Sequence, residues 1–321
     1  MHSRYISHNT AVNSKDLIRF LAYFDIFKHP LQQKELEQML AQPLGDLLEA
    51  LCNKGVLYCI DGFYMLEKNH EWFHQRLDKN KRAKSYHKKI KNVSKIIRLF
   101  PFTRSICISG SLSKGVMDKD GDIDFFIMAA NNRIWLNRTM LILFKKIFLL
   151  NSKKYFCVNY FIDEKILEIP DQNIFTAMEI WHLMPVNNQG LYDQFMKDNH
   201  WIHSYFPEKP NREVLVPAHK ISAFTRFLEW MLSGSLGNRL DDFCFRYTVK
   251  HWKKKFGDFD AETYDLVFRS EKSVSKHHPN NFQKKVLEAL EERMEKYEDK
   301  FHQAFEEILK EERGHPEKEA I

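Results

Sequence analysis

The amino-acid sequence predicts an α+β fold, in which a small mixed sheet with helices is flanked on both sides by helical segments. Two observations predict this fold. From Thr103 onward, short apolar runs rich in β-branched and aromatic residues alternate with a helical stretch, as in an α/β core. On both sides of this region, apolar residues recur at helical spacing. The hydrophobic content of 44% and the charged content of 29% are those of an ordinary globular protein.

The first part of the chain predicts three helices followed by a small hairpin. The helices are expected within 14–27, 31–41 and 44–55, and the strands of the hairpin turn at Asp61-Gly62. This order is that of a winged-helix-like domain, which we place at residues 1–68. Winged helices read DNA or serve as docking modules, and the third helix is not rich in Arg, Asn or Gln. Both roles stay open.

Residues 69–100 predict a basic helical connector. The net charge of the chain is only +6, but its basic residues are unevenly placed. We expect this helix to face an acidic partner or water. The basic residues that stand almost unopposed here are Arg76, Lys79, Lys81, Arg82, Lys84, Lys88, Lys89, Lys91, Lys95 and Arg98.

Residues 101–170 predict the α/β core, and residues 171–321 a helical C-terminal domain. The core is expected to have strands within 104–110, 122–129 and 154–162 and a helix within 133–150. From Asp171 onward, every long apolar pattern has helical spacing.

The cysteines and the apolar runs indicate the compartment. Five cysteines are scattered without a CxxC spacing, which favours reduced thiols over disulfides or a zinc site. The longest apolar stretch is interrupted by charged residues, and the first ten residues have no signal-peptide core. We therefore expect a cytoplasmic protein with no membrane partner.

The stretch "SICISGSLSKGVMDKDGDIDFFIM" carries the chemistry. In a strand, Asp122 and Asp124 point to the same face, where two carboxylates repel each other unless a cation such as Mg²⁺ neutralises them. Upstream, Gly110 lets the backbone approach a ligand closely, and Ser111 offers a hydroxyl and an N–H to a phosphate. The same Asp-apolar-Asp spacing at Asp258-Phe259-Asp260 lacks the Gly-Ser pair, and we interpret it as solvated surface or a helix cap.

The segment "ISGSLSKGVMDKDGDIDFFI" resembles the signature of the DNA polymerase beta-like nucleotidyltransferase superfamily. The resemblance covers about residues 101–165 and implies a nucleotidyltransferase-type mixed sheet. It implies that Gly110 and Ser111 hold the phosphates of a nucleotide, with Ser113 and Lys114 in the same loop. It also implies that Asp122 and Asp124 bind Mg²⁺ or Mn²⁺.

One position departs from this superfamily, which usually supplies a third carboxylate from a later strand. Here the mid-strand polar residue of "YFCVNYFID" is Asn159. Asp163 lies four residues further, about 13 Å along a strand, and is expected to be too far to substitute. Asn159 can offer an amide oxygen to a metal, but it cannot act as a general base. A hydrogen-bonded Asn159 in a site that has lost activity is the alternative.

A second carboxylate could come from the helix after the third strand. Glu179 is expected either to activate an acceptor hydroxyl or to be an ordinary surface or capping residue. Lys114 is expected either to contact the phosphates or to be solvated.

We therefore predict a metal-dependent nucleotidyltransferase that moves a nucleoside monophosphate from a nucleoside triphosphate such as ATP to a hydroxyl acceptor, with release of pyrophosphate. The catalytic candidates are Asp122, Asp124, Asn159 and Glu179. The alternative is a catalytically inactive protein that senses nucleotide, or binds nucleic acid through the winged helix and the basic connector. The acceptor is left open among small hydroxylated metabolites, a protein side chain and an RNA end.

Overall fold

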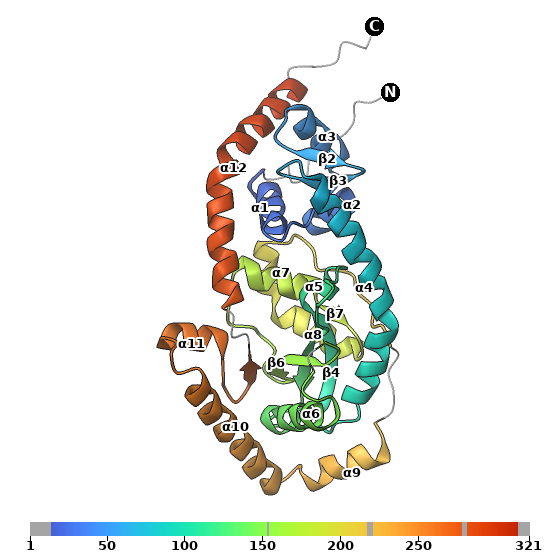
Figure 1. Cartoon of the computed structure of the whole chain (residues 1–321), viewed down its shortest axis with the longest axis vertical. Coiled ribbons are helices and arrows are strands. Elements are labelled where there is room, and N and C mark those ends of the chain that lie inside the picture. The colour runs from blue at the N-terminus through green and yellow to red at the C-terminus, as the bar shows by residue number, and fades with distance from the viewer. Residues whose placement is uncertain (1–13, 153, 217–220, 278–280, 314–321) are drawn as a thin grey trace. The chain divides into compact units, whose positions relative to one another are not determined.

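The computed structural model describes residues 14–152, 154–216, 221–277 and 281–313, and its secondary structure is mixed α and β (Figure 1). The chain divides into two compact units. Unit 1 comprises residues 1–77, 203–209 and 284–321, and unit 2 comprises residues 78–202 and 210–283. Each unit is therefore assembled from separate stretches of the sequence.

Unit 1 contains three short helices, a small antiparallel sheet of strand order β1-β3-β2, and most of a long C-terminal helix. The first helix buries Leu17, Phe20 and Phe24, while the last helix buries Phe301 and Phe305. The hairpin turns at Asp61 and Gly62, where the sequence predicts it. The elements are α1 (Ser14–Asp25), β1 (Leu31–Gln32), α2 (Gln33–Leu40), α3 (Gly45–Asn53), β2 (Tyr58–Ile60), β3 (Phe63–Met65) and α12 (Phe282–Arg313).

Unit 2 is built on a five-stranded mixed sheet of strand order β7-β4-β5-β6-β8, in which β5 and β6 are parallel and the other pairs are antiparallel. Its core elements are α4 (His70–Ile97, from Asp78 onward), β4 (Thr103–Ser109), α5 (Gly110–Ser113), β5 (Asp124–Ala129), α6 (Ile134–Phe148) and β6 (Cys157–Asp163). The remaining elements are α7 (Ile174–His182), β7 (Met184–Pro185), α8 (Gln189–Asp198), the 3₁₀ helix η1 (His200–Ser204, up to Ile202), α9 (Ala223–Met231), α10 (Ser235–Lys255), α11 (Ala261–Val267) and β8 (Val274–Lys276).

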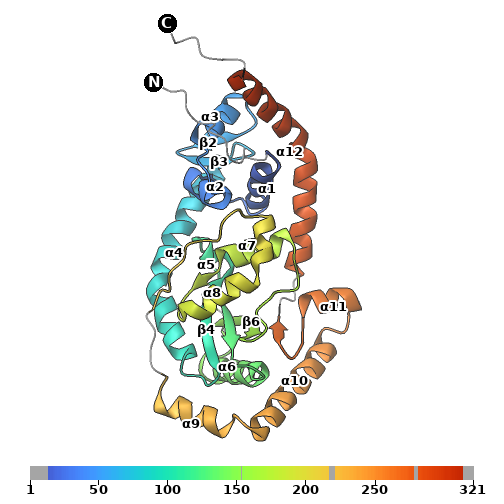
Figure 2. The same cartoon turned by 180° about the vertical axis from the view of Figure 1, so that it is seen from behind.

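Helices cover both faces of this sheet. Strand residues of one parity, among them Ile108, Phe125 and Ile127, are fully buried in a cluster with apolar residues of α4 and α6. On the opposite face lie α7 and α8 (Figure 2), and Phe126 packs edge-on against Phe195 of α8 at a centroid distance of 5.3 Å. Side chains alternate along β5, so Phe125 and Ile127 face α4 and α6, whereas Asp124 lies on the opposite face of the sheet with Phe126.

The structure differs from the sequence prediction after Asp171. That region is not wholly helical, because β7 and β8 form the two edges of the sheet. Strands of two and three residues are too short to show an alternating pattern, so only their pairing partners reveal them. The interpretation of Asp260 as a helix cap is confirmed, since its carboxylate accepts the backbone N–H of Thr263 at the start of α11.

Across the described residues, each helix is too short or too polar to cross a bilayer.

Candidate active site

The site begins where β4 ends. Gly110 follows Ser109, which pairs with Asp124 of the neighbouring strand. Gly110 has a φ of +69°, and a Cβ placed on it would lie 2.6 Å from the Oδ2 atom of Asp124. Only a residue without a side chain lets the backbone turn this close to the carboxylate. The short helix α5 then leads into the spacer that precedes Asp122.

Asp124 opens β5, and its carboxylate lies between several polar groups. The pKa of Asp124 is raised to about 6, first because burial disfavours the charged form and then because Asp122 and Glu179 are nearby anions. Hydrogen bonding to the Cys157 side chain and the charge of Lys114 act in the opposite direction. The site therefore concentrates negative charge that a cation would neutralise.

Asn159 reaches Asp124 from the adjacent parallel strand. The register pairs Phe125 with Val158 and Phe126 with Tyr160, so Asn159 is the additional residue of a bulge. Its Nδ2 atom donates a 3.0 Å hydrogen bond to Asp124 Oδ1. Within the described part of the chain, its Oδ1 atom is buried without a hydrogen-bond partner. A buried amide oxygen of this kind is available to a ligand.

Glu179 lies on α7 and contacts the Gly110 loop. Its Oε1 atom lies 2.6 Å from Lys114 Nζ, and its Oε2 atom accepts the backbone N–H of Gly110 at 3.3 Å. Lys114 Nζ also donates to the carbonyl oxygen of Gly110 at 3.3 Å. The Gly110 loop thus already holds one anionic group.

The two serines of the loop differ in their placement. Ser113 is buried and donates its hydroxyl to the carbonyl oxygen of Gly110 at 2.8 Å, so this side chain closes the loop on itself. Ser111 is half-buried, and its backbone carbonyl accepts the N–H groups of Lys114 and Val116 at 3.1 and 3.2 Å. Asp122 is also half-buried, two residues before β5.

Three contributors to the site were missed by sequence reasoning. Cys157 lies opposite Asp124 in the strand register and hydrogen-bonds its carboxylate. Two basic residues of α4 hold the spacer: Arg82 Nε donates to the carbonyl oxygen of Met117 at 3.1 Å, and Lys79 forms a 2.9 Å ion pair with Asp118. The available signal for Lys79 and Arg82 was their position on a basic helix immediately before the core, which predicted an acidic partner or water but not a contact with the spacer.

The chemistry of these side chains is that of ligands for a hard divalent cation. Asp122 and Asp124 carry carboxylate oxygens and, among the described residues, Asn159 has an Oδ1 atom without a hydrogen-bond partner, and hard cations take oxygen ligands of these kinds. Among the described residues, no cluster of three or more His, Cys, Asp or Glu side chains is arranged for a metal. Asp163 does not supply a third carboxylate, because it is buried and accepts the N–H groups of Asn132 and Lys165, both at 2.9 Å.

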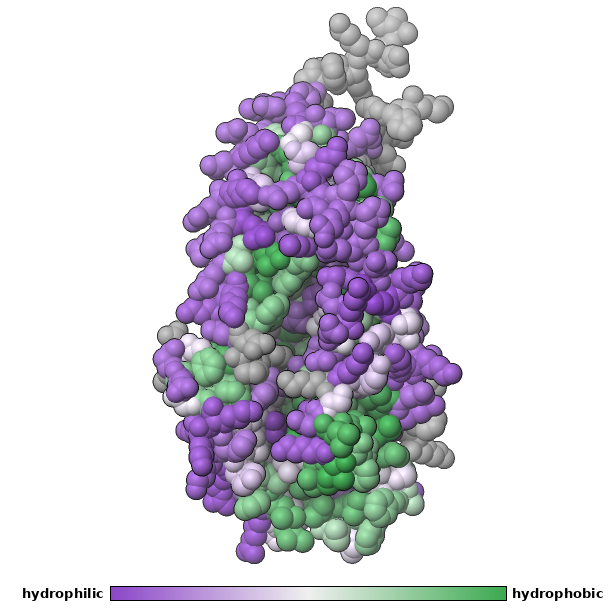
Figure 3. Space-filling view, in the orientation of Figure 1, coloured by the Kyte–Doolittle hydropathy of each residue, from purple (hydrophilic) through white to green (hydrophobic). Residues whose placement is uncertain are grey.

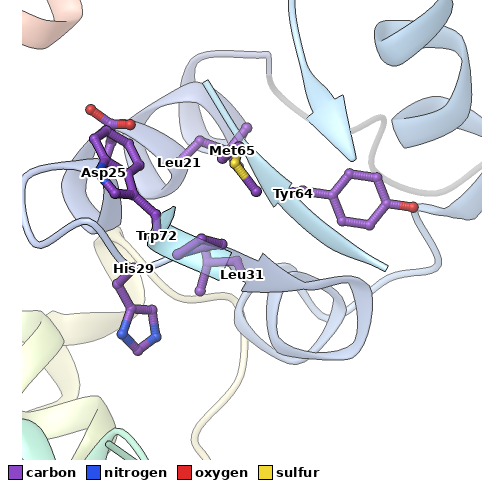
Figure 4. A pocket seen from close by; sticks show the side chains of 8 residues that line it. Leu21, Asp25, His29, Leu31, Tyr64, Met65 and Trp72 are labelled. Carbon is purple, nitrogen blue, oxygen red and sulfur yellow. The ribbon is translucent and has the colours of Figure 1, made fainter. Parts of the chain in front are cut away.

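A small pocket elsewhere contains none of these residues. It lies in unit 1 and is lined by residues of α1, the β1 and β3 strands and the start of α4 (Figure 4). Its polar lining side chains include Asp25 and His29.

The glycine loop folds against an aspartate at the start of the adjacent strand, and the comparison with known families gives the class of this domain. Residues 71–180 match the family described as nucleotidyltransferase domain. The chain therefore contains a nucleotidyltransferase domain, and the resemblance to the DNA polymerase beta-like superfamily is confirmed. The match supports nucleotidyl transfer as the general activity. No curated protein and no solved structure matches the chain significantly.

Proposed function

We propose that this protein is a metal-dependent nucleotidyltransferase that transfers a nucleoside monophosphate from a nucleoside triphosphate to a hydroxyl acceptor and releases pyrophosphate. The observation that carries the proposal is the approach of Gly110 to Asp124, since a side chain at Gly110 would meet the carboxylate at 2.6 Å. This approach places a backbone N–H suited to phosphate beside a carboxylate suited to a cation.

Asp122 and Asp124 are proposed to hold Mg²⁺ or Mn²⁺. The cation would supply neutralisation of the phosphate charge next to these two carboxylates. Asn159 would orient Asp124 through the hydrogen bond from its Nδ2 atom, and its Oδ1 atom, which has no hydrogen-bond partner among the described residues, would be available to the cation as a neutral ligand. Cys157 adds a second donor to Asp124.

Gly110, Ser111 and Lys114 are proposed to bind the triphosphate, while Ser113 maintains the shape of the loop. In the structure, Glu179 takes both the Gly110 N–H and the Lys114 ammonium group. A phosphate that takes these donors releases the Glu179 carboxylate. The released carboxylate then accepts the proton of the acceptor hydroxyl as its oxygen attacks the α-phosphorus and pyrophosphate leaves.

The remaining parts are assigned supporting roles. We propose that α1, α2, α3 and the β2–β3 hairpin form a winged-helix docking module, and that the helices after residue 171 complete the acceptor side. A triphosphate substrate supports the expected cytoplasmic location. The exposed lysines of α4 leave nucleic acid open as a partner.

The test measures pyrophosphate release with each of the four ribonucleoside triphosphates over a panel of hydroxylated metabolites, proteins and RNA ends. We expect release only with Mg²⁺ or Mn²⁺, and none from the double variant Asp122→Asn with Asp124→Asn. Nucleotide binding that is unchanged by a chelator and by the double variant would contradict the metal site. Binding without release for any acceptor would favour the nucleotide-sensing alternative.

A matched pair of glycine variants distinguishes two effects of a side chain at Gly110: the collision with the Asp124 carboxylate and the strain of a positive φ. Gly110 and Gly115 have φ values of +69° and +73°, but a Cβ at Gly115 would have no atom within 4 Å. Both alanine variants therefore carry similar backbone strain, about 1 kcal/mol. We expect Gly110→Ala to abolish nucleotide binding and Gly115→Ala to retain it. Equal losses in both variants would show that loop strain alone is responsible.

A further inference from the structure

The outward faces of α9 and α10 are apolar. Their most exposed large side chains include Trp230 at 74% and Phe224 at 70%. In Figure 3, apolar colouring gathers over the part of unit 2 where α6, α9 and the start of α10 lie in Figure 1, while the rest of α10 is mostly hydrophilic in this view. We use the term apolar face for six of these residues: Phe224, Phe227, Trp230, Leu236, Phe243 and Tyr247.

The orientation of α9 is the reverse of that of an ordinary surface helix. Its polar side faces the protein: Thr225 is buried and donates to the carbonyl oxygen of Leu99 at 3.0 Å. Glu229 accepts the backbone N–H of Phe102 at 2.5 Å and the guanidinium of Arg104 at 2.8 Å. Because these polar anchors take the inner side, the apolar residues are left outside. An amphipathic helix normally buries its apolar stripe.

The start of α10 is held just as firmly. The Arg133 guanidinium donates to the carbonyl oxygens of Leu232 and Ser233 at 3.0 and 2.7 Å and to Asn238 Oδ1 at 2.6 Å. Asp241 accepts the backbone N–H of Leu136 at 2.8 Å. The apolar face is therefore a fixed part of unit 2.

The apolar face is larger than an ordinary surface patch. Aromatic side chains contribute about 150–250 Å² each. At the exposed fractions of these six residues, the face amounts to roughly 700 Å². The largest apolar patch on a monomeric protein is typically about 300–600 Å². A surface of this size indicates an interaction site.

Most charges beside the apolar face are positive. The three acidic residues of α9 and α10 each form an ion pair with a cation of another segment: Glu229 with Arg104, and both Asp241 and Asp242 with Lys272. Apart from Asp242, whose side chain is 51% exposed, the exposed charged residues of these helices are basic: Arg226, Arg239, Arg246, Lys250, Lys253, Lys254 and Lys255. On α10, Arg239 and Arg246 lie four residues before and three after Phe243, so a basic row runs beside the apolar one.

We propose that the apolar face docks on the surface of a lipid bilayer with anionic headgroups. Aromatic side chains enter the boundary between headgroups and acyl chains, while the adjacent basic row binds the headgroups. A second copy of the chain fits less well, because a two-fold interface would bring the basic rows together. This surface docking departs from the expectation of no membrane partner, which was based on spanning segments and a signal peptide.

The experiment is co-sedimentation of the full-length protein with vesicles of phosphatidylcholine alone or of equal parts phosphatidylcholine and phosphatidylglycerol. We expect binding to the anionic vesicles that weakens as salt is raised. Phe227→Ala with Trp230→Ala should lower the partition coefficient at least about tenfold. Arg239→Glu with Arg246→Glu should lower it by a similar factor, and only for anionic vesicles.

The matched control is Ile166→Ala, which removes an apolar side chain of 54% exposure from the connection between β6 and α7 and should bind like wild type. Absence of wild-type binding to anionic vesicles, or binding of both double variants as strong as that of wild type, would overturn the proposal. So would a wild-type dimer in sedimentation velocity that ignores vesicles and becomes monomeric in the Phe227/Trp230 variant, since the face would then belong to a second copy.

Discussion

At the scale of single residues, the charge of Asp124 makes the stability of the protein depend on pH. Its pKa is about 6 in the folded protein against an ordinary value of 3.8. Above pH 6 the folded protein holds a charged carboxylate that the unfolded chain solvates better, which costs stability. As the pH falls from 6 toward 4, the folded protein takes up the proton first and this cost disappears.

We therefore predict that Asp124→Asn raises the melting temperature of the chelator-treated protein at pH 8, and that the difference from wild type vanishes near pH 4. The measurement is thermal unfolding followed by circular dichroism over this pH range. Asp120→Asn is the control, because Asp120 is exposed and should change the melting temperature little at any pH. A stabilisation that persists unchanged at pH 4 would show that charge is not its cause.

Asn159 is the residue where the site departs from its superfamily. Asn159→Asp would supply the usual third carboxylate beside Asp124, and we expect it to keep or raise pyrophosphate release in the presence of Mg²⁺. Asn159→Ala removes the donor to Asp124 and should lower release about 10- to 100-fold without abolishing nucleotide binding. Loss of all activity in Asn159→Asp would mean that the amide hydrogen bond is essential.

Among the elements, α4 combines a buried and a basic side. Ala83, Tyr86, Ile90 and Ile97 are buried at helical spacing, whereas Lys84, Lys88 and Lys91 are exposed. We predict that changing these three lysines to Glu together shifts the melting temperature by less than about 2 °C, because exposed charges contribute little to stability. Unfolding monitored by circular dichroism measures this shift.

Arg82→Glu is the comparison variant on the same helix, because Arg82 contacts the spacer whereas the three lysines are exposed. Arg82 holds the spacer through the carbonyl oxygen of Met117, so its reversal should weaken nucleotide binding as measured by calorimetry. The three-lysine variant should bind nucleotide like wild type. A loss of nucleotide affinity in the lysine variant alone would show that the exposed side of α4, and not the spacer contact, serves the site.

The strands around the site could be predicted because their signals are local. The Gly-Ser pair and the two aspartates occur within fifteen residues, and the strands around them are short apolar runs that are almost entirely buried. The bulge at Asn159 could not be predicted, since it exists only in the pairing of β6 with β5. The same holds for Cys157 opposite Asp124 and for the edge strands β7 and β8, which depend on partners distant in sequence.

At the scale of the whole molecule, ligand binding should stabilise one unit selectively. Of the six tryptophans, only Trp72 belongs to unit 1, so fluorescence of Trp72→Phe reports on unit 2. We predict that Mg²⁺ with a nucleoside triphosphate raises the fluorescence-detected melting temperature of this variant by several degrees. A second transition, followed by circular dichroism, should not move. Equal shifts of both transitions would show that the two units unfold together.

The division of the chain also determines which unit is completed first during translation. Unit 1 begins with residues 1–77 but needs the segment from residue 284 onward, which supplies the buried Phe301 and Phe305. At about 5–20 residues per second, a ribosome adds that last segment roughly 10–40 s after residue 77 has been translated. Unit 2 ends at residue 283, so it is completely translated first. The nascent chain therefore completes unit 2 while α1 to α3 still await their closing helix, which leaves the apolar residues of these three helices without their α12 partners during this interval.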